Sequence, residues 1–164
     1  MRKIGLLSDT HNYLDPLVFK HFENVDEIWH AGDIGNLNIL ESLERFKPTK
    51  AVYGNIDGGI VKQSCPEDLW WESEGFVLWM THIGGYPTKY ASRIKKILKF
   101  RQPDIFICGH SHILKVMKDP DFNFYVMNPG AAGREGFHLV RTLLTFNLDQ
   151  KKITDLKVIE IGSR

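Results

Sequence analysis

The sequence contains very little cysteine. Two of its 164 residues are cysteines, Cys65 and Cys108, and they do not form a C-x-x-C pair. This low content excludes a disulfide scaffold, and the spacing argues against a zinc knuckle. We therefore expect reduced thiols in a cytoplasmic protein.

Long apolar runs and an imbalance of charge are also lacking. No run approaches the roughly 20 apolar residues that span a bilayer, and the first one stops at Ser8, too early for a signal peptide. The 21 basic and 20 acidic residues leave a formal net charge of +1. Without an overall field to attract nucleic acid or an acidic membrane surface, we expect neither as a partner.

The remaining composition is that of a globular protein. Hydrophobic residues make up 43% and charged residues 25%, and no repeat, low-complexity stretch or flexible linker divides the chain. A chain of this length fits one domain of the commonest size. We expect residues 1–164 to form a single domain.

Apolar patterning predicts alternating strands and helices. Strands are expected at 2–7, 27–29, 50–53, 70–73, 76–81, 104–108, 124–127, 142–147 and 153–161, and helices at 16–22, 38–46 and around 90–98. The first two β-α-β units favour a parallel sheet, and the hairpin that follows introduces antiparallel strands. The prediction is an α/β fold of mixed sheets flanked by helices.

Polar side chains follow five of these strands at the points where they end. They are of the types that bind metal ions: Asp9 and His11, Asp33, Asn55, His82, and His110 with His112. The carboxyl ends of parallel strands share one rim, so these side chains are expected to converge. Two carboxylates about 4 Å apart would repel by roughly 4 kcal/mol at an effective dielectric of about 20, so convergence requires a cation. Carboxylate, imidazole and amide donors without thiolate suit manganese, iron, nickel, cobalt or zinc.

Glycine stands directly before three of the candidate ligands, in Gly32-Asp33, Gly54-Asn55 and Gly109-His110. A residue without a side chain permits a sharp turn from strand to loop and a close approach of other groups. The glycines therefore support the prediction that the site lies at this rim.

The candidate residues belong to five short motifs in a fixed order: Asp9-Thr10-His11, Gly32-Asp33, Gly54-Asn55-Ile56-Asp57, Thr81-His82 and Gly109-His110-Ser111-His112. With this ordered set the chain resembles the calcineurin-like metallophosphoesterases. Within them it resembles the small YfcE-type phosphodiesterase subgroup, which is similar to the vacuolar sorting protein 29 fold. The resemblance implies a four-layer α/β/β/α sandwich, in which two mixed β-sheets are flanked by helices, with a two-metal site at the rim.

The resemblance also implies a role for each ligand. Asp9, His11 and His112 would hold one divalent ion, Asn55, His82 and His110 the other, and Asp33 would bridge the two. Manganese is the first choice among the metals named above. A hydroxide shared by the ions would attack phosphorus in line, with Asp33, Asn55 and His82 as catalytic residues. The expected reaction is hydrolysis of a small organic phosphodiester.

One position departs from the family pattern. The larger phosphatases of the superfamily carry a histidine directly after the asparagine ligand as a general acid, and this chain has Ile56 there. Isoleucine cannot donate a proton, and general acid catalysis is typically worth about 10² to 10⁴ in rate. Asn12 and Arg134 are candidates to contact a substrate phosphate, with a turn-forming and a surface role as their alternatives.

For several other residues the sequence indicates a structural or an interface role less specifically. His30 is either a hydrogen-bond partner of the site or a buried structural histidine, and Asp57 is expected to cap a turn. Adjacent Trp70 and Trp71 must point to opposite faces of a strand, so we expect one of them to be exposed at a subunit or partner interface. The sequence allows a homo-oligomer but does not determine the oligomeric state.

A second function class also stays open. The chain could be a binding module that keeps the metallophosphoesterase fold while losing useful catalysis, as the likeness to the sorting protein allows. A competent residue at all seven ligand positions favours the enzyme, and Ile56 alone favours the module.

Overall fold

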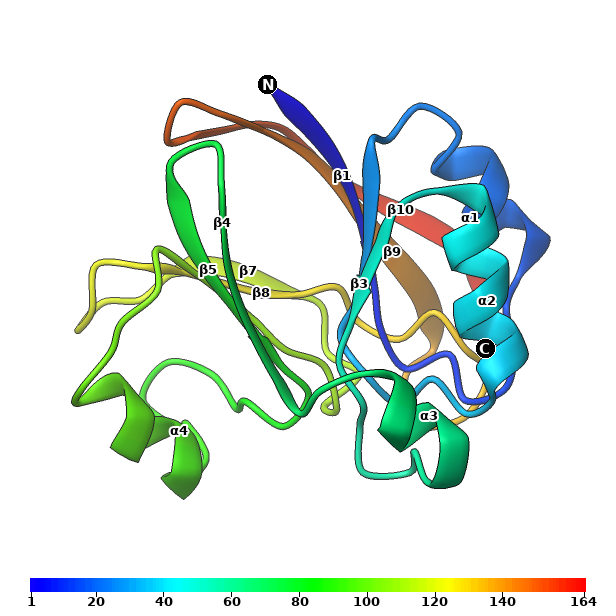
Figure 1. Ribbon diagram of the computed structural model, residues 1–164, viewed down its shortest axis with the longest axis horizontal. Coiled ribbons are helices and arrows are strands. Elements are labelled where there is room, and N and C mark those ends of the chain that lie inside the picture. Colours follow the sequence, from blue (N-terminus) through cyan, green and yellow to red (C-terminus); the bar gives the residue numbers. More distant parts are fainter.

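Two five-stranded mixed sheets form the centre of the protein, seen in a computed structural model that describes residues 1–164 (Figure 1). The strands are β1 (Arg2–Leu7), β2 (Glu27–His30), β3 (Thr49–Ala51), β4 (Asp68–Ser73), β5 (Phe76–Thr81), β6 (Ile105–Ile107), β7 (Lys115–Lys118), β8 (Tyr125–Asn128), β9 (Val140–Asp149) and β10 (Lys152–Ser163). The helices are α1 (Pro16–His21), α2 (Leu37–Phe46), α3 (Gly59–Ser64) and α4 (Ser92–Leu98).

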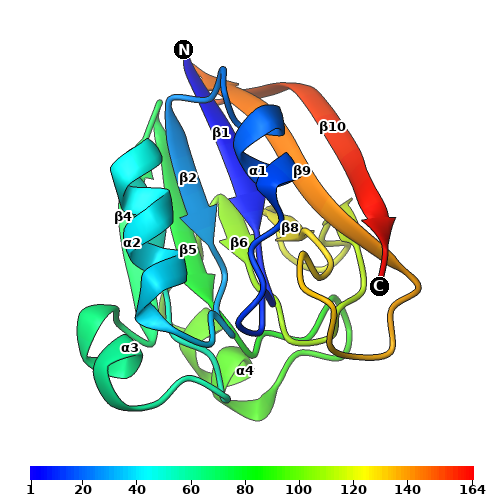
Figure 2. The ribbon, with the colours of Figure 1, turned by 90° about the vertical axis from the view of Figure 1, so that its right-hand side faces the viewer.

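The central strands of both sheets are parallel. The first sheet has the order β10-β9-β1-β2-β3, in which β1, β2 and β3 are parallel while β9 and β10 run antiparallel as a hairpin. The second has the order β4-β5-β6-β8-β7, with β5, β6 and β8 parallel and antiparallel strands at both edges. Figure 2 shows β1 and β2 pointing toward the edge of the molecule where α3 and α4 lie.

The layers are held together by three apolar cores. One lies between α1, α2 and the first sheet and includes Phe22 and Leu43, both fully buried. The second fills the space between the sheets and includes Trp29 and Phe146. The third packs the second sheet against α4. Figure 1 shows α1 and α2 on one side of the sheets and α4 on the other, so the four-layer α/β/β/α prediction is confirmed.

The two adjacent tryptophans differ from the prediction. Trp70 stacks on Trp79 beneath α4, with ring centroids 4.8 Å apart, and Trp71 meets Trp29 edge-on between the sheets at 4.9 Å. Both are half-buried, so the expectation that one would be exposed is wrong. The reason is that β4 has a layer packed against each of its faces, one being the first sheet and the other α4.

Two short elements were not expected from the pattern. Helix α3 has six residues, of which only Val61 is buried. One buried position is too few to show the spacing of apolar residues that predicts a helix. Strand β7 has four residues and pairs only with β8 at the edge of its sheet. None of the helices has both the length and the hydrophobicity needed to cross a membrane.

Candidate metal centre

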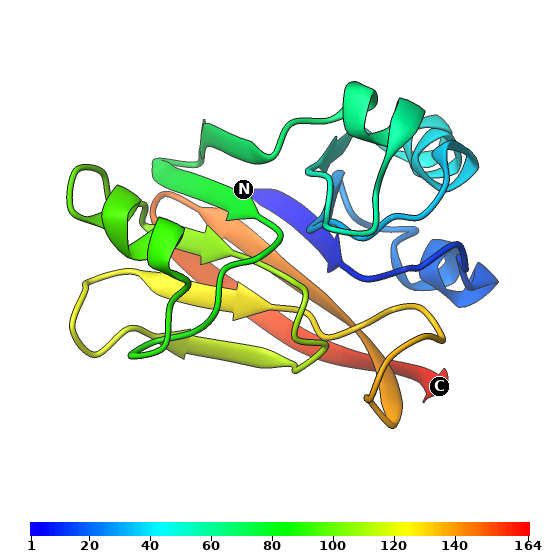
Figure 3. The same cartoon turned by 90° about the horizontal axis from the view of Figure 1, so that it is seen from below.

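The loops that follow the parallel strands bring the predicted ligands to one rim. Asp9 and His11 follow β1, Asp33 follows β2, and Asn55 follows β3. From the second sheet, His82 comes directly after β5, while His110 and His112 follow β6. Figure 3 shows the ends of the two sheets from this side, with α3 and α4 next to them. Both layers therefore contribute to a single site.

One group of potential ligands consists of Asp9, His11 and His112. One donor atom from each lies within 4.8 Å of the other two. Oδ1 of Asp9 is 3.2 Å from Nε2 of His112 and 3.8 Å from Nε2 of His11. Asp9 is completely buried, and the two histidines are partly exposed.

A second group consists of Asp33, His82 and His110, whose donor atoms also lie within 4.8 Å of one another. Oδ1 of Asp33 is 3.2 Å from Nε2 of His82. Its other oxygen, Oδ2, is 3.4 Å from Nε2 of His11 in the first group. The Asp33 carboxylate thus faces both groups, one oxygen toward each.

Three buried polar atoms at this site have no hydrogen-bond partner: Oδ1 of Asp9, Nε2 of His11 and Nε2 of His82. They make up three of the four such side-chain atoms in the protein. A buried polar atom left without a partner typically costs about 1 to 3 kcal/mol, so their concentration at one point needs an explanation. Lone pairs of carboxylate and imidazole aimed at a common space are what a divalent cation requires, and the residues fit such an ion.

Hydrogen bonds on the far side of two imidazoles orient them toward this space. Nδ1 of His82 is 2.7 Å from the carbonyl oxygen of Ala31, to which it donates, so Nε2 carries the free lone pair. Nδ1 of His112 is 3.2 Å from Nδ1 of His138, whose Nε2 is 2.9 Å from the carbonyl oxygen of Gly133. Histidine ligands of metals are usually fixed by such partners.

The backbone at the site is strained. Five of the seven predicted ligands have φ in the left-handed region, namely Asp9 (54°), His11 (44°), Asp33 (54°), His110 (68°) and His112 (56°). This conformation is uncommon for residues other than glycine, and it persists where the surrounding structure enforces it, typically at functional sites. The strain aims the ligand side chains at one point.

Two glycines leave room for the ligands. A Cβ on Gly54 would lie 2.0 Å from Oδ1 of Asp33, and a Cβ on Gly32 would lie 2.7 Å from Nδ1 of His82. Contacts this short do not occur, so any side chain at either glycine would displace a ligand. The close approach expected from the sequence is confirmed at both positions.

The carboxylates and imidazoles favour each other's charged forms. Burial alone would lower the pKa of His82, but the carboxylates of Asp33 and Asp9 raise it above its usual value. The pKa of His11 is also raised, chiefly by Asp9. Burial would raise the pKa of Asp33, yet His82 holds it below its usual value. Because protons compete with metal for imidazole, binding of a metal here should strengthen as pH rises.

His30 and Asp57 support the loops and do not face the two ligand groups. His30 is fully buried, with Nε2 3.0 Å from Oγ1 of Thr10, and burial lowers its pKa to about 4. Asp57 accepts from the backbone N–H groups of Ile34, Gly35 and Gly54 at 2.7 to 3.0 Å. The predicted turn-capping role of Asp57 is confirmed, and His30 is a buried histidine that fixes the Thr10 loop.

Three other residues were predicted for the site, namely Asn55, Asn12 and Arg134. Asn55 is exposed and lines the same cavity as His82. Oδ1 of Asn12 accepts from Nδ2 of Asn36 at 3.1 Å. The Arg134 guanidinium lies over the Tyr13 ring, 4.2 Å from its centroid. Substrate contact by Asn12 and Arg134 stays a prediction.

Two residues near the centre were not identified as contacts of the ligands from the sequence. His138 reaches His112 as described, and Oε2 of Glu135 is 3.8 Å from Nδ1 of His11. Both come from the loop before β9, which carries none of the five motifs. In the sequence, the glycines and the proline of 128–134 indicate a structured turn near the rim and no contact with a ligand.

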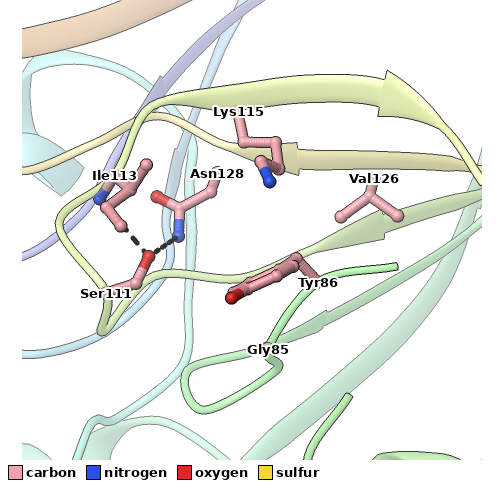
Figure 4. A pocket seen from close by; sticks show the side chains of 7 residues that line it. All are labelled: Gly85, Tyr86, Ser111, Ile113, Lys115, Val126 and Asn128. Atoms are coloured by element: carbon pink, nitrogen blue, oxygen red, sulfur yellow. Dashed lines mark hydrogen bonds between the residues drawn. The ribbon is translucent and has the colours of Figure 1, made fainter. Parts of the chain in front are cut away.

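Two hollows adjoin the centre. A cavity of about 430 Å³ is lined by Asn55, His82 and residues of the neighbouring helices. A smaller pocket of about 140 Å³ lies beside Ser111, the residue between His110 and His112. Figure 4 shows Lys115 and Tyr86 in this pocket, and the Ser111 hydroxyl accepting hydrogen bonds from Asn128 and Ile113.

Comparison with known proteins identifies the family. Residues 2–151 match the model of the calcineurin-like phosphoesterase superfamily domain. A probable metallophosphoesterase of Methanothermobacter thermautotrophicus is 31% identical, over 78% of this chain and 76% of that protein. A phosphodiesterase of Methanocaldococcus jannaschii is 30% identical, over 78% of this chain and 82% of that protein.

The fold is also found among solved structures. The structure of wild-type Vps29 from Entamoeba histolytica in complex with Zn²⁺ aligns with a TM-score of 0.74 at 15% identity, covering 97% of this chain and 98% of that one. This likeness confirms the fold that the five motifs imply. The family match and the two relatives show that the chain belongs to the calcineurin-like phosphoesterase superfamily, whose members depend on divalent metal ions.

Proposed function

We propose that this protein is a metal-dependent phosphodiesterase that hydrolyses a small organic phosphodiester at a two-metal site. The observation that carries the proposal is the convergence of two ligand groups with Asp33 facing both. The relative from Methanocaldococcus jannaschii, which is named a phosphodiesterase, supports the choice of ester.

The residues divide between two ions as follows. Asp9, His11 and His112 would hold one, Asn55, His82 and His110 the other, and Asp33 would contact both. Two divalent ions would supply Lewis acidity for the phosphoryl oxygens and lower the pKa of a water molecule. Manganese is our first choice, and the same donors suit iron, nickel, cobalt or zinc.

Hydrogen bonds from the protein hold two of the proposed catalytic residues in place. Asp33, Asn55 and His82 are the proposed catalytic residues, and the Nδ1–H of His82 bonded to Ala31 keeps its ring in place. The backbone N–H of Ile56 donates to Oδ1 of Asp33 at 3.1 Å and fixes that carboxylate. The side chain of Ile56 offers no proton, so substrates whose leaving oxygen is weakly basic should react best.

A binding module is the second candidate, favoured by one observation. Ile56 is 44% exposed at the rim, where the larger phosphatases of the superfamily carry a proton donor and where an apolar side chain suits contact with a partner. A module that binds metal without turnover would give full metal content and no hydrolysis.

The test is an activity screen combined with elemental analysis. Protein purified with Mn²⁺, Fe²⁺, Ni²⁺, Co²⁺ or Zn²⁺ should bind two ions per chain and hydrolyse bis(p-nitrophenyl) phosphate faster than p-nitrophenyl phosphate. Asp33→Asn should abolish turnover and leave the protein folded, whereas the exposed control Asp121→Asn should not change the rate. A limit of one ion per chain, or full activity of Asp33→Asn, would contradict the proposal.

A further inference from the structure

The cavity of about 430 Å³ is larger than catalysis at phosphorus requires. Pockets for organic ligands usually range from about 300 to 1,000 Å³, so this cavity can hold a substituent of the size of a nucleoside or a sugar. Asn55 and His82 belong to its lining, which places any group bound here next to the proposed metal ligands. A phosphodiester held at the centre would direct one of its two ester groups into this space.

The cavity lies where the two halves of the fold meet. Lys62 comes from α3, which follows the third strand of the first sheet, and Arg93 comes from α4 on the outer face of the second sheet. Figure 1 shows these two helices at the same end of the molecule. Neither helix carries a metal-ligand motif, so their contribution to the cavity is separate from metal binding.

The two cations in the cavity differ in their partners. Arg93 bonds to Asp68, and its Nη2 is 3.7 Å from Oε1 of Glu67, so its charge is compensated. Lys62 has no carboxylate within 4.0 Å, and its ammonium lies 5.0 Å from the centroid of the Tyr53 ring. Lys62 is therefore the cation that remains free to meet an anionic group in the cavity.

Two further residues of the lining are suited to contact with a ring. Tyr53 is half-buried and presents its aromatic ring, and Ile83, directly after His82, is 44% exposed. Aromatic and branched apolar side chains around a few polar groups are typical of sites for organic ligands. The cavity combines these surfaces with two cations and the carboxylate of Glu67, which pairs with Arg93, so that Lys62 is the cation without an ion-pair partner.

We propose that this cavity binds one ester group of the substrate and selects a ring-bearing group that carries a second phosphate, as in a phosphorylated nucleoside, with Lys62 facing that phosphate. The proposal rests on the proposed phosphodiesterase function and adds the substrate class to it. Lys62 is a specificity-determining residue, and the reaction at the metal centre does not require it.

Two substrates that differ only at the remote group test the proposal. The p-nitrophenyl ester of thymidine 5′-phosphate and the same ester carrying a 3′-phosphate share the leaving group and the bond that is broken. An exposed ion pair contributes up to about 1 kcal/mol, so the wild-type KM should be lower for the 3′-phosphorylated ester by about threefold to fivefold. The kcat values should be similar.

Lys62→Gln should abolish this preference by raising KM for the 3′-phosphorylated ester alone. Lys152→Gln, at an exposed lysine on β10, is the matched control and should keep the preference. The preference should also decline with rising salt, as expected for a partly exposed charge pair. Equal KM values for the wild type, or an unchanged preference in Lys62→Gln, would overturn the proposal.

A binding measurement separates failure of this proposal from failure of the proposed function. If neither ester is hydrolysed, the phosphodiesterase function is wrong for these compounds. Calorimetry with the manganese-loaded protein then compares thymidine 3′,5′-bisphosphate with thymidine 5′-monophosphate. Tighter binding of the bisphosphate, lost in Lys62→Gln and kept in Lys152→Gln, would support the anion-selective cavity, and equal binding would refute it.

Discussion

Nδ1 of His112 lies 3.2 Å from Nδ1 of His138. Nε2 of His138 is 2.9 Å from the carbonyl oxygen of Gly133 and must donate to it, because a carbonyl can only accept. With its proton on Nε2, neutral His138 accepts at Nδ1, so His112 donates from Nδ1 and keeps a lone pair on Nε2. That Nε2 faces Oδ1 of Asp9. His138 therefore sets the tautomer of a proposed metal ligand from outside the ligand set.

Replacing His138 should weaken metal binding without removing a ligand. Loss of such a supporting partner typically costs about 10-fold to 100-fold in metal affinity, which we expect for His138→Ala in a chelator competition assay. His138→Asn places an amide oxygen close to the lost Nδ1 and should restore part of the affinity. His21→Ala, on α1, serves as the control and should bind metal as the wild type does. Equal affinity of all the variants would show that His112 needs no partner.

Gly54→Ala should damage the metal centre. The added Cβ would lie 2.0 Å from Oδ1 of Asp33, so the carboxylate that faces both ligand groups would have to move. We expect loss of most activity and of at least one bound ion, measured by elemental analysis. Gly58→Ala is the matched control, since no atom lies within 4 Å of its Cβ, and it should keep both. Normal metal content in Gly54→Ala would show that Asp33 can shift without consequence.

Much of this fold could be predicted because its strongest signals are local. Strands β1 and β5 contain apolar runs that end at polar loop residues, and α2 buries Ile39, Leu40 and Leu43 at helical spacing. The edge elements β7 and α3 bury little, so their sequences carry almost no periodic signal. The burial of both Trp70 and Trp71 cannot be predicted from β4 alone, because the covering of both faces of this strand is a property of the layers.

The residues of the candidate centre also fall into a predictable group and an unpredictable group. The residues in the five motifs follow predicted strands, so topology alone indicates that they meet at one rim. His138 and Lys62 act through contacts made across the fold, one with His112 and the other with the cavity. Neither sits at a strand end, and no spacing rule links them to the motifs.

A buried ion pair away from the centre should govern acid stability. Nη1 of Arg141 donates to Oδ2 of Asp15 at 2.7 Å, and Asp15 also caps α1 by accepting from Leu17 N–H. Burial alone would raise the pKa of Asp15, but these hydrogen bonds hold it below its usual value. A carboxylate with a lowered folded-state pKa stabilises the protein above its unfolded pKa of about 3.9, and this contribution is lost as pH falls through the folded value.

Asp15→Asn isolates the charge, because asparagine caps helices as well as aspartate does. It leaves the buried Arg141 guanidinium without its partner, so the free energy of unfolding at pH 7 should fall by about 3 kcal/mol. The difference from wild type should begin to shrink below about pH 4, where the carboxylate of the unfolded chain becomes protonated, and should vanish only below the lowered folded-state pKa. Urea titrations at pH 7 and pH 3 measure both effects. Asp155→Asn, which breaks an exposed pair with Lys157, should change stability by less than about 1 kcal/mol.

Ile56 should determine which esters the enzyme hydrolyses quickly. If no side chain protonates the leaving oxygen, that oxygen must carry its own charge, and the rate should depend steeply on leaving-group pKa. Aryl diesters should therefore react far faster than alkyl diesters. A series of substituted phenyl and alkyl esters of one phosphate measures this slope.

Ile56→His places a proton donor where the larger phosphatases of the superfamily have one. The side chain of Ile56 is 44% exposed, so the loop has room for an imidazole, and the backbone N–H that donates to Asp33 is unchanged. The variant should recover part of the roughly 10² to 10⁴ that general acid catalysis contributes, for alkyl esters and hardly at all for aryl ones. Ile56→Gln controls for polarity, because its amide does not act as an acid. A flat wild-type slope, measured in single turnovers so that product release does not limit the rate, would mean that another residue already supplies the proton.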